Sequence, residues 1–227
     1  MTKKLNIALV GNPNSGKTTV FNNLTGTHQY VGNWPGVTVE KKEGTCRYQD
    51  YQITVADLPG VYSLTAYSLD EIIARDFIVE EKPDVVVDIV DAGNLERNLY
   101  LTVQLLEMGA RLIVALNMMD EAGGRGYRID LEHLSYHLGT PVVPMVASRN
   151  RGTQELLGQI ARIAESRVPP SGLRIDYGRE VEEEIEKLED LISQSALSRL
   201  YPARWLAVKL LEEDEEVTKK FKEGNVD

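Results

Sequence analysis

The sequence predicts an α/β fold: a doubly wound sheet followed by a shorter helical segment. Strand-like and helix-like segments alternate from residue 5 to about residue 165. Segments 85–90 and 112–116 are nearly continuous apolar runs, which are typical of parallel strands buried on both faces. Segment 5–10 is also apolar and leads through a glycine-containing loop into a helical pattern. In this fold class the ligand is expected at the carboxyl ends of the strands.

The predicted elements follow one another along the chain. Strands are expected at residues 6–10, 38–48, 51–57, 85–91, 111–117 and 141–145, and helices at residues 17–25, 69–80, 94–109, 130–138 and 152–164. The proline- and glycine-containing segment 168–172 is interpreted as a linker. It divides the chain into a sheet domain, residues 1–167, and a helical unit, residues 168–227.

Apolar spacing predicts the helical unit. One helix face is marked by Val181, Ile185, Leu188 and Ile192. A second helix is expected to begin at Pro202, because proline favours the first helical position. Its apolar face would carry Trp205, Val208 and Leu211. The sequence stops soon after an acidic helix with no closing feature, which indicates a portion of a longer protein.

Composition limits the classes of protein that the chain can represent. It has 227 residues, 42% of them hydrophobic and 26% charged, which is ordinary for a globular protein. The net charge of −10 weighs against nonspecific binding to nucleic acid or anionic lipid. The single cysteine, Cys46, excludes an internal disulfide and is expected to be buried. Because no apolar run approaches the roughly 18 residues of a membrane span and Met1–Leu5 leads straight into a strand, a soluble cytosolic chain is expected.

Residues 11–18 read Gly-Asn-Pro-Asn-Ser-Gly-Lys-Thr and fit G-x-x-x-x-G-K-[ST], the phosphate-binding loop. Gly11 and Gly16 permit backbone conformations in which consecutive amides point at phosphate oxygens. Lys17 is expected to reach the β and γ phosphates, and the Thr18 hydroxyl to bind Mg²⁺. The remaining residues expected to contact nucleotide in this segment are Asn12, Pro13, Asn14, Ser15 and Thr19. The alternative is a chance loop in a protein that binds no nucleotide.

Asp57-Leu58-Pro59-Gly60 follows an apolar strand and matches D-x-x-G of GTP-binding proteins. An Asp at a strand end beside the phosphate loop can hold Mg²⁺, commonly through water. Gly60 can offer its amide to the γ-phosphate without interference from a side chain. The motif is weak alone, but its distance from the phosphate loop and its place at a strand end strengthen it.

Asn117-Met118-Met119-Asp120 ends another apolar strand and resembles the N-K-x-D guanine motif, with Met118 in place of Lys. The Asp120 carboxylate can accept bonds from guanine N1–H and the 2-amino group, whereas adenine would leave it desolvated and unpaired. Asn117 would brace the loop and approach the N7 edge, and Met118 would lie along the base. The alternative is an ordinary helix cap after a strand. A backbone amide of Ala147 or Ser148, after the last strand, is expected to reach guanine O6.

A glycine-containing segment, residues 31–40, lies between the phosphate loop and Asp57. Its glycines, Gly32 and Gly36, together with Pro35, predict a mobile loop. Thr38 is the expected switch residue, whose hydroxyl completes the Mg²⁺ shell when a γ-phosphate is present, and Gly36 and Val37 lie beside it. Trp34 is alternatively a surface aromatic that awaits a partner.

These motifs, with the strings Asn33–Glu40 and Asn94–Leu101, closely resemble the N-terminal cytosolic domain of the ferrous iron transport protein B (FeoB) family. The resemblance is dense over residues 3–165 and looser to residue 227. It implies a Ras-like P-loop GTPase, with GTP or GDP as ligand, on the cytoplasmic face of the inner membrane. The helical unit would be a GDI-like spacer. The implied partners are a membrane permease region of the same polypeptide and small accessory iron-transport proteins, with a homo-oligomer left open.

The residue after Gly60 is Val61, where Ras-like GTPases carry a water-orienting Gln, so slow intrinsic hydrolysis is expected. A cation can offset the charge that grows between the β and γ phosphates. The Asn14 side chain, with carbonyls of the Gly32–Gly36 loop including those of Gly32 and Trp34, is the expected K⁺ site, and similar cation-dependent GTPases carry an Asn there. The alternative is that Asn14 only stabilises the turn.

Other features invite different interpretations. His133 and His137 have the i, i+4 spacing of a metal pair, but no third ligand is evident. The run Glu212–Glu216 is interpreted as a solvated helix face rather than an Fe²⁺ site. A ribosome- or tRNA-associated GTPase is opposed by the net charge of −10 and the lack of a basic extension, so no nucleic-acid partner is expected. A P-loop ATPase is opposed by Asp120.

Overall fold

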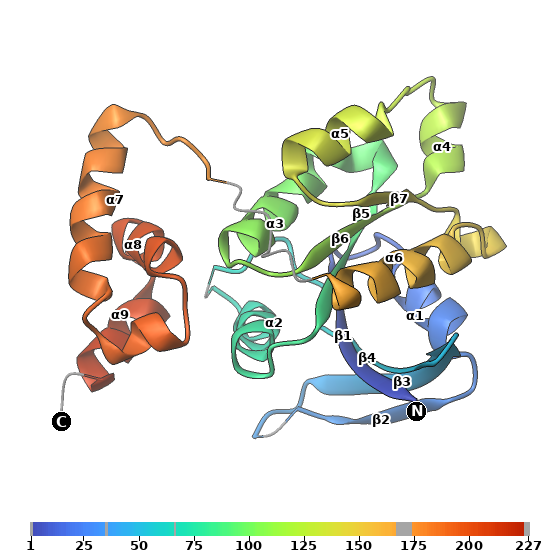
Figure 1. Ribbon diagram of the computed structural model, residues 1–227, viewed down its shortest axis with the longest axis horizontal. Helices are drawn as coiled ribbons and strands as arrows, with labels where there is room; N and C mark the ends of the chain where they lie inside the picture. Colours follow the sequence, from blue (N-terminus) through green and yellow to red (C-terminus); the bar gives the residue numbers. More distant parts are fainter. Residues whose placement is uncertain (1, 35, 66, 167–173, 225–227) are drawn as a thin grey trace.

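The computed structural model describes residues 2–34, 36–65, 67–166 and 174–224. A seven-stranded sheet in the order β2-β3-β4-β1-β5-β6-β7 forms its centre (Figure 1). The strands are β1 Lys3–Gly11, β2 Gln29–Asn33, β3 Glu40–Tyr48, β4 Tyr51–Asp57, β5 Val85–Asp91, β6 Leu112–Asn117 and β7 Val142–Pro144. From β4 to β7 neighbouring strands run parallel, as the apolar runs indicated. The expectation of an α/β P-loop fold with a helical subdomain is confirmed.

One edge of the sheet is antiparallel. β3 pairs with β4 through a tight turn in which Gln49 has φ 51°, and β2 pairs with β3. β2 was not predicted from the sequence. Four of its five residues are exposed, so it has no apolar alternation, and only its register against β3 defines it. Cys46, expected to be buried, is half-buried in β3, and burial raises the pKa of its thiol to about 11.

Helices cover both faces of the sheet. One face is packed by α1 Lys17–Thr25 and α6 Thr153–Glu165. The other is packed by α2 Leu69–Glu80, α3 Leu95–Glu107 and α5 Leu131–Leu138. α2 begins with a capping box, in which the Ser68 hydroxyl accepts the Glu71 amide while the Glu71 carboxylate accepts the Ser68 amide. A short helix that was not predicted, α4 Met119–Gly124, follows β6 directly.

The helical unit contains α7 Arg179–Ile192, α8 Ala203–Leu211 and α9 Glu215–Gly224 (Figure 1). Its buried side chains include Ile185, Ile192 and Trp205, and they continue the core that covers the α2 and α3 face of the sheet. Two residues predicted for apolar faces are instead exposed: Val181 is 42% and Leu211 44% exposed. Each lies in a terminal turn of its helix, beyond the packed centre. The predicted linker, residues 168–172, and the boundary at residue 167 lie outside the described residues.

Polar contacts join the helical unit to the sheet domain. Arg75 of α2 forms an ion pair with Asp214, with Nη1 and Oδ2 3.3 Å apart, and the two side chains are 1% and 3% exposed. Lys220 pairs with Asp76, the next residue of α2, at 3.2 Å. Tyr177 donates its hydroxyl to Glu107 at the end of α3. Within the described ranges, none of the helices combines the length and apolar character needed to cross a bilayer.

Candidate functional site

The predicted phosphate loop lies where β1 ends and α1 begins, at the carboxyl edge of the sheet. An open cavity of about 390 Å³ is lined there by Asn12, Pro13, Asn14, Gly16, Lys17, Thr18 and Gly60. The side-chain polar atoms of Asn12 and the Ser15 hydroxyl are buried without a hydrogen-bond partner among the described residues. Buried polar groups normally have partners, so these atoms fit a loop shaped to receive a polar ligand.

Close approach explains the glycines of this loop. A Cβ on Gly16, whose φ is 90°, would lie 2.3 Å from Asn117 Nδ2, and one on Gly11 would lie 2.6 Å from the Ile89 carbonyl oxygen. A side chain at either position would displace the loop. Asn14 also adopts a left-handed backbone, with φ 66°, which Asn tolerates better than most residues, and its side chain is exposed.

The cationic and acidic residues expected at the phosphates and Mg²⁺ are in contact. Lys17 Nζ donates to Asp57 Oδ1, and the two side chains are 12% and 6% exposed. Gly60 lies against Pro13, since a Cβ built on Gly60 would be 3.5 Å from the Pro13 Cα. Thr18 and Thr19 are exposed in the first turn of α1. Lys17, Thr18 and Gly60 therefore line one hollow, and Asp57 contacts Lys17 beside it.

Val61 itself is placed for packing. Its side chain is 3% exposed within the core on the α2 and α3 face, and its amide donates to the Gly11 carbonyl at 3.2 Å. An apolar side chain turned into the core presents no polar atom to a water molecule at the phosphates. Val61 therefore cannot replace a water-orienting Gln in this conformation, as its residue type predicts.

Asn117 connects the two motifs of the site. Its Nδ2 donates to the Ser15 carbonyl at 2.9 Å, and its Oδ1 accepts the Ala147 amide at 2.9 Å. The Ala147 carbonyl in turn accepts from Asn23 of α1 at 2.8 Å. Because Asn117 already engages the Ala147 amide, the Ser148 amide is the better placed of the two expected donors to guanine O6.

The segment after Asn117 forms a tight turn into α4. Met118 has φ 60° and precedes the helix, and its methyl group lies 3.7 Å from a Cβ built on Gly16. Asp120 follows in the first turn and is 31% exposed. Arg149 Nη2 lies 3.6 Å from Asp120 Oδ2. Reasoning from the sequence assigned no role to Arg149, because no local spacing relates it to Asp120.

The expected mobile loop is largely a hairpin turn. Gly32 lies within β2, opposite Lys41 of β3, rather than in a loop. Gly36, with φ 75°, and Thr38 are exposed in the turn, and Val37 is half-buried. In the part of the chain that the structure describes, Thr38 makes no hydrogen bond to Thr18 or Asp57. Pro35 lies outside the described residues.

Trp34 is not the surface aromatic that one interpretation expected. It is 8% exposed and meets Phe77 of α2 edge to face, with ring centroids 5.4 Å apart. Lys41 Nζ lies 5.0 Å from the centroid of the Trp34 ring. The Trp34 carbonyl, one of the expected K⁺ ligands, accepts the Val37 amide at 3.2 Å. The indole is therefore a core anchor for the hairpin turn.

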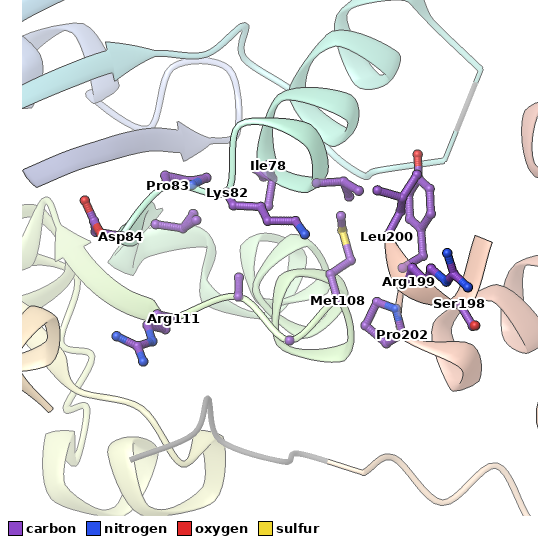
Figure 2. A pocket seen from close by; sticks show the side chains of 15 residues that line it. Ile78, Lys82, Pro83, Asp84, Met108, Arg111, Ser198, Arg199, Leu200 and Pro202 are labelled. Atoms are coloured by element: carbon purple, nitrogen blue, oxygen red, sulfur yellow. The ribbon is translucent and has the colours of Figure 1, made fainter. Parts of the chain in front are cut away.

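Other features lie away from this site. A cavity of about 520 Å³ opens between the ends of α2 and α3 and residues 198–202, and Figure 2 shows Lys82, Met108 and Pro202 around it. It contains none of the predicted site residues. His133 and His137 are exposed, with their Nε2 atoms 3.2 Å apart. Across the described ranges, no group of at least three His, Cys, Asp or Glu side chains gathers as a metal site would require.

The acidic run after α8 is not uniformly solvated, contrary to the expectation for residues 212–216. Asp214 is 8% exposed, pairs with Arg75 and accepts the Val217 amide at 3.0 Å. Glu212 accepts from Lys209 at 2.6 Å. These contacts give part of the run a structural role that charge patterning alone does not predict.

Comparison with known proteins follows the same division of the chain. Residues 5–160 match the family described as ferrous iron transport protein B, and residues 177–227 match the FeoB cytosolic helical domain. The Fe(2+) transporter FeoB of Salmonella typhimurium is 50% identical over 217 residues, which cover 93% of this chain and 27% of that protein. A Porphyromonas gingivalis Fe(2+) transport protein A/Fe(2+) transporter FeoB fusion protein is 47% identical over 220 residues, covering 95% and 26%.

A solved structure extends the comparison to the fold. The cytosolic domain of T. maritima FeoB in a GDP form superposes with a TM-score of 0.92 at 41% identity, covering 100% of this chain and 88% of that one. The same domain in a GMPPNP form gives a TM-score of 0.90. The chain spans about a quarter of the length of the curated relatives it matches. Its motifs, its fold and its relatives agree, and the chain belongs to the ferrous iron transport protein B family.

Proposed function

We propose that this chain binds GTP and hydrolyses it to GDP and phosphate as the cytosolic part of an Fe²⁺ transporter. The observation that carries the proposal is the pair of hydrogen bonds made by Asn117, which holds the phosphate loop and the base-contacting loop at one edge of the sheet. The solved relatives in GDP and GMPPNP forms support guanine nucleotide as the ligand. In this arrangement one end of the site takes phosphates and the other takes the base.

The residues at the phosphate end fit a Mg²⁺-bound nucleotide. The amides of the loop and Lys17 would take the phosphate oxygens, while Thr18, Asp57 and Thr38 would hold the metal. Mg²⁺ would supply neutralisation of phosphate charge. Lys17 and Asp57 now satisfy each other, so binding exchanges one buried ion pair for two contacts with the ligand. Because the Lys17–Asp57 pair is largely buried, it holds both charged side chains beside the phosphate loop before nucleotide binds.

Asp120 would set the preference for guanine over adenine. Its carboxylate is partly exposed, and among the described residues the cation close to it is the exposed Arg149 at 3.6 Å. An exposed pair of this kind is worth roughly 0–1 kcal/mol, so guanine can displace Arg149 at little cost. Met118, Asn117 and the Ser148 amide would complete the base site from the remaining sides.

Hydrolysis would be slow without a monovalent cation. Val61 offers no polar group, and Asn14 is exposed at the phosphate loop with its side chain free to turn toward a cation. We place K⁺ beside Asn14, with backbone carbonyls of the 32–36 segment as further ligands. Since the Trp34 carbonyl already accepts the Val37 amide and Gly32 lies within β2, the turn would have to rearrange to bind the cation.

The helical unit would connect the nucleotide site to the rest of the transporter. In this proposal residues 1–167 form the GTPase domain and residues 168–227 a spacer that leads to a membrane permease region of the same polypeptide, at the cytoplasmic face of the inner membrane. The Arg75–Asp214 ion pair ties α2, the helix that follows the Gly60 segment, to that spacer. Small accessory iron-transport proteins and a second copy of the chain are the other partners proposed.

Nucleotide preference and turnover test the proposal together. Titration calorimetry should give tighter binding of GTP and GDP than of ATP and ADP, and phosphate release should be measurable with GTP and Mg²⁺. Lys17→Ala is the matched negative control, because it removes the phosphate contact and leaves the base site intact. Equal affinity for ATP and GTP, or no release of phosphate from GTP in K⁺ buffer, would contradict the proposed function.

A further inference from the structure

The loop that follows Gly60 is held by helix α3, which carries most of the string Asn94–Leu101 singled out in the sequence. Residues 61–65 run from the nucleotide site toward α2. Two of their contacts come from α3 side chains, and neither side chain belongs to a nucleotide motif. The site as described so far gives these α3 residues no role.

The first contact is a buried hydrogen bond. Gln104 Oε1 accepts the Leu64 amide at 2.7 Å, and the two residues are 4% and 0% exposed. A backbone N–H in such a place cannot turn to water if the acceptor is lost, so the bond fixes the position of Leu64. A glutamine that is almost fully buried on an otherwise apolar helix face is costly unless its amide has such a partner.

The second contact lies two helical turns earlier on α3. The Arg97 guanidinium carbon lies 4.2 Å from the centroid of the Tyr62 ring. Residues 97 and 104 are seven positions apart and therefore project from the same side of the helix. Further along, Tyr100 shares a cavity of about 600 Å³ with Thr65 and Tyr67. One face of α3 thus lies along residues 62–65 and beside Tyr67.

The other end of the loop is fixed at the phosphate loop. The Val61 amide donates to the Gly11 carbonyl at 3.2 Å, and Gly60 lies against Pro13. Between Val61 and Leu64 the chain has few degrees of freedom, because both amides are anchored. The phosphate loop and α3 therefore hold the two ends of the segment that follows Gly60.

We propose that Gln104 is a positioning residue for GTP hydrolysis: by accepting the Leu64 amide it holds the loop so that the Gly60 amide faces the γ-phosphate. Arg97 assists through the Tyr62 ring at the exposed side of the same loop. The inference rests on the proposed GTPase function. GDP has no γ-phosphate, so the contribution of Gln104 is specific to the triphosphate.

Gln104→Met tests this role, because methionine nearly matches glutamine in size and cannot accept the Leu64 amide. We expect kcat for GTP to fall about tenfold, since the buried Leu64 amide loses the acceptor that it has among the described residues. The affinity for GMPPNP should fall, while the affinity for GDP stays within about twofold of the parent, since nothing that GDP touches has changed. Gln104→Glu keeps an oxygen at the same place and should restore most of kcat.

Gln159→Met is the matched control. Gln159 lies on α6, on the opposite face of the sheet, and its Oε1 is buried without a partner within the described residues. It should hydrolyse GTP at the parental rate. If neither the parent nor this control releases phosphate, the proposed GTPase function fails and Gln104 is not at issue.

The remaining outcomes decide the inference alone. If the parent hydrolyses GTP and Gln104→Met has the same kcat, Gln104 does not position the loop. An equal loss of affinity for GDP and GMPPNP overturns the specific role, because it indicates general damage to the site. A Gln104→Glu variant as slow as Gln104→Met also overturns it, because the acceptor oxygen would then be irrelevant.

Discussion

The side-chain amide of Asn117 donates to the backbone carbonyl of Ser15 at 2.9 Å, which joins the end of β6 to the phosphate loop. The bond is buried, and the same side chain accepts the Ala147 amide. One residue therefore sets the distance between the phosphate and base ends of the site. In the proposed function, a guanine nucleotide would span that distance.

Replacing Asn117 by alanine should weaken both ends of the site at once. We expect Asn117→Ala to lower the affinity for GDP and GTP alike by at least about tenfold, because two buried hydrogen bonds are lost. Asn23→Ala is the control, since it removes one bond to the Ala147 carbonyl and leaves the phosphate loop braced. Titration calorimetry decides between them, and equal effects of the two variants would contradict the bracing role of Asn117.

Asp120→Asn should shift the nucleotide preference from guanine toward xanthine. An amide cannot accept both guanine donors, so GTP affinity should fall strongly, while xanthosine triphosphate, which presents a 2-oxo acceptor, should gain relative affinity. Arg149→Gln is the companion variant, because it removes the cation beside Asp120 and leaves the carboxylate. Its GTP affinity should stay within about fivefold of the parent, as expected for an exposed pair. If Asp120→Asn binds GTP as tightly as the parent, Asp120 does not contact the base.

Potassium dependence tests the site beside Asn14. GTP turnover should be faster with K⁺ than with Na⁺ as the sole monovalent cation, and Asn14→Ala should lose that difference while keeping GDP affinity. The reason is that the cation would offset charge between the β and γ phosphates, where Val61 provides nothing. Identical rates of the parent in both salts would eliminate the K⁺ site, and a variant that still responds to K⁺ would assign the ligand elsewhere.

A buried carboxyl in the centre of the sheet makes stability depend on pH. Asp88 of β5 is 1% exposed and accepts the Thr102 hydroxyl at 2.6 Å, and burial raises its pKa from the ordinary value of 3.8 to about 7. Between these values the unfolded chain has released the proton that the folded chain retains. The contribution of Asp88 to stability therefore decreases as pH rises through that window and is constant above it.

Asp88→Asn should remove this dependence and keep an acceptor for Thr102. Above pH 7 the variant should be more stable than the parent by on the order of 2–4 kcal/mol, and the two should converge near pH 4. Urea unfolding across that range measures the difference. A parent and variant that differ by the same amount at every pH would show that Asp88 titrates normally.

The buried ion pair between α2 and the helical unit should be costly to break. Arg75→Met leaves Asp214 charged and buried, and we expect unfolding free energy to fall by about 3–5 kcal/mol. Lys187→Met is the control, because its pair with Glu184 is exposed and should contribute less than about 1 kcal/mol. Hydrogen exchange should rise in residues 203–224 of the first variant only. Unchanged protection there would mean that the pair does not hold the helical unit.

Much of the fold could be predicted because its strongest constraints are local. The runs 85–90 and 112–116 are nearly continuous in apolar residues because those strands are buried on both faces, and the phosphate loop follows a fixed spacing. β2 could not be predicted, because pairing with β3 rather than any pattern of its own makes it a strand. The short helix α4 could not be predicted, because it follows strand β6 through a left-handed residue, Met118, that the sequence pattern does not indicate.

The site could be predicted to the extent that its residues lie in motifs. Lys17, Asp57 and Gly60 meet as their motifs require. Arg149 and Gln104 were missed, because each acts on a residue distant in sequence and neither residue type is unusual at its position. The burial of Trp34 could not be predicted for a related reason. Its partner, Phe77, lies on a helix far along the chain, and nothing in the local sequence of the turn indicates that contact.

The burial of Trp34 packs the hairpin turn firmly against helix α2. Trp34 packs on Phe77 of this helix. Arg75, two positions before Phe77, forms an ion pair with Asp214 of the helical unit. The turn is therefore connected through α2 to the helical unit, because the Arg75–Asp214 ion pair attaches that unit to the same helix. In the proposed function, a movement of this turn on binding GTP would therefore reach the helical unit through α2.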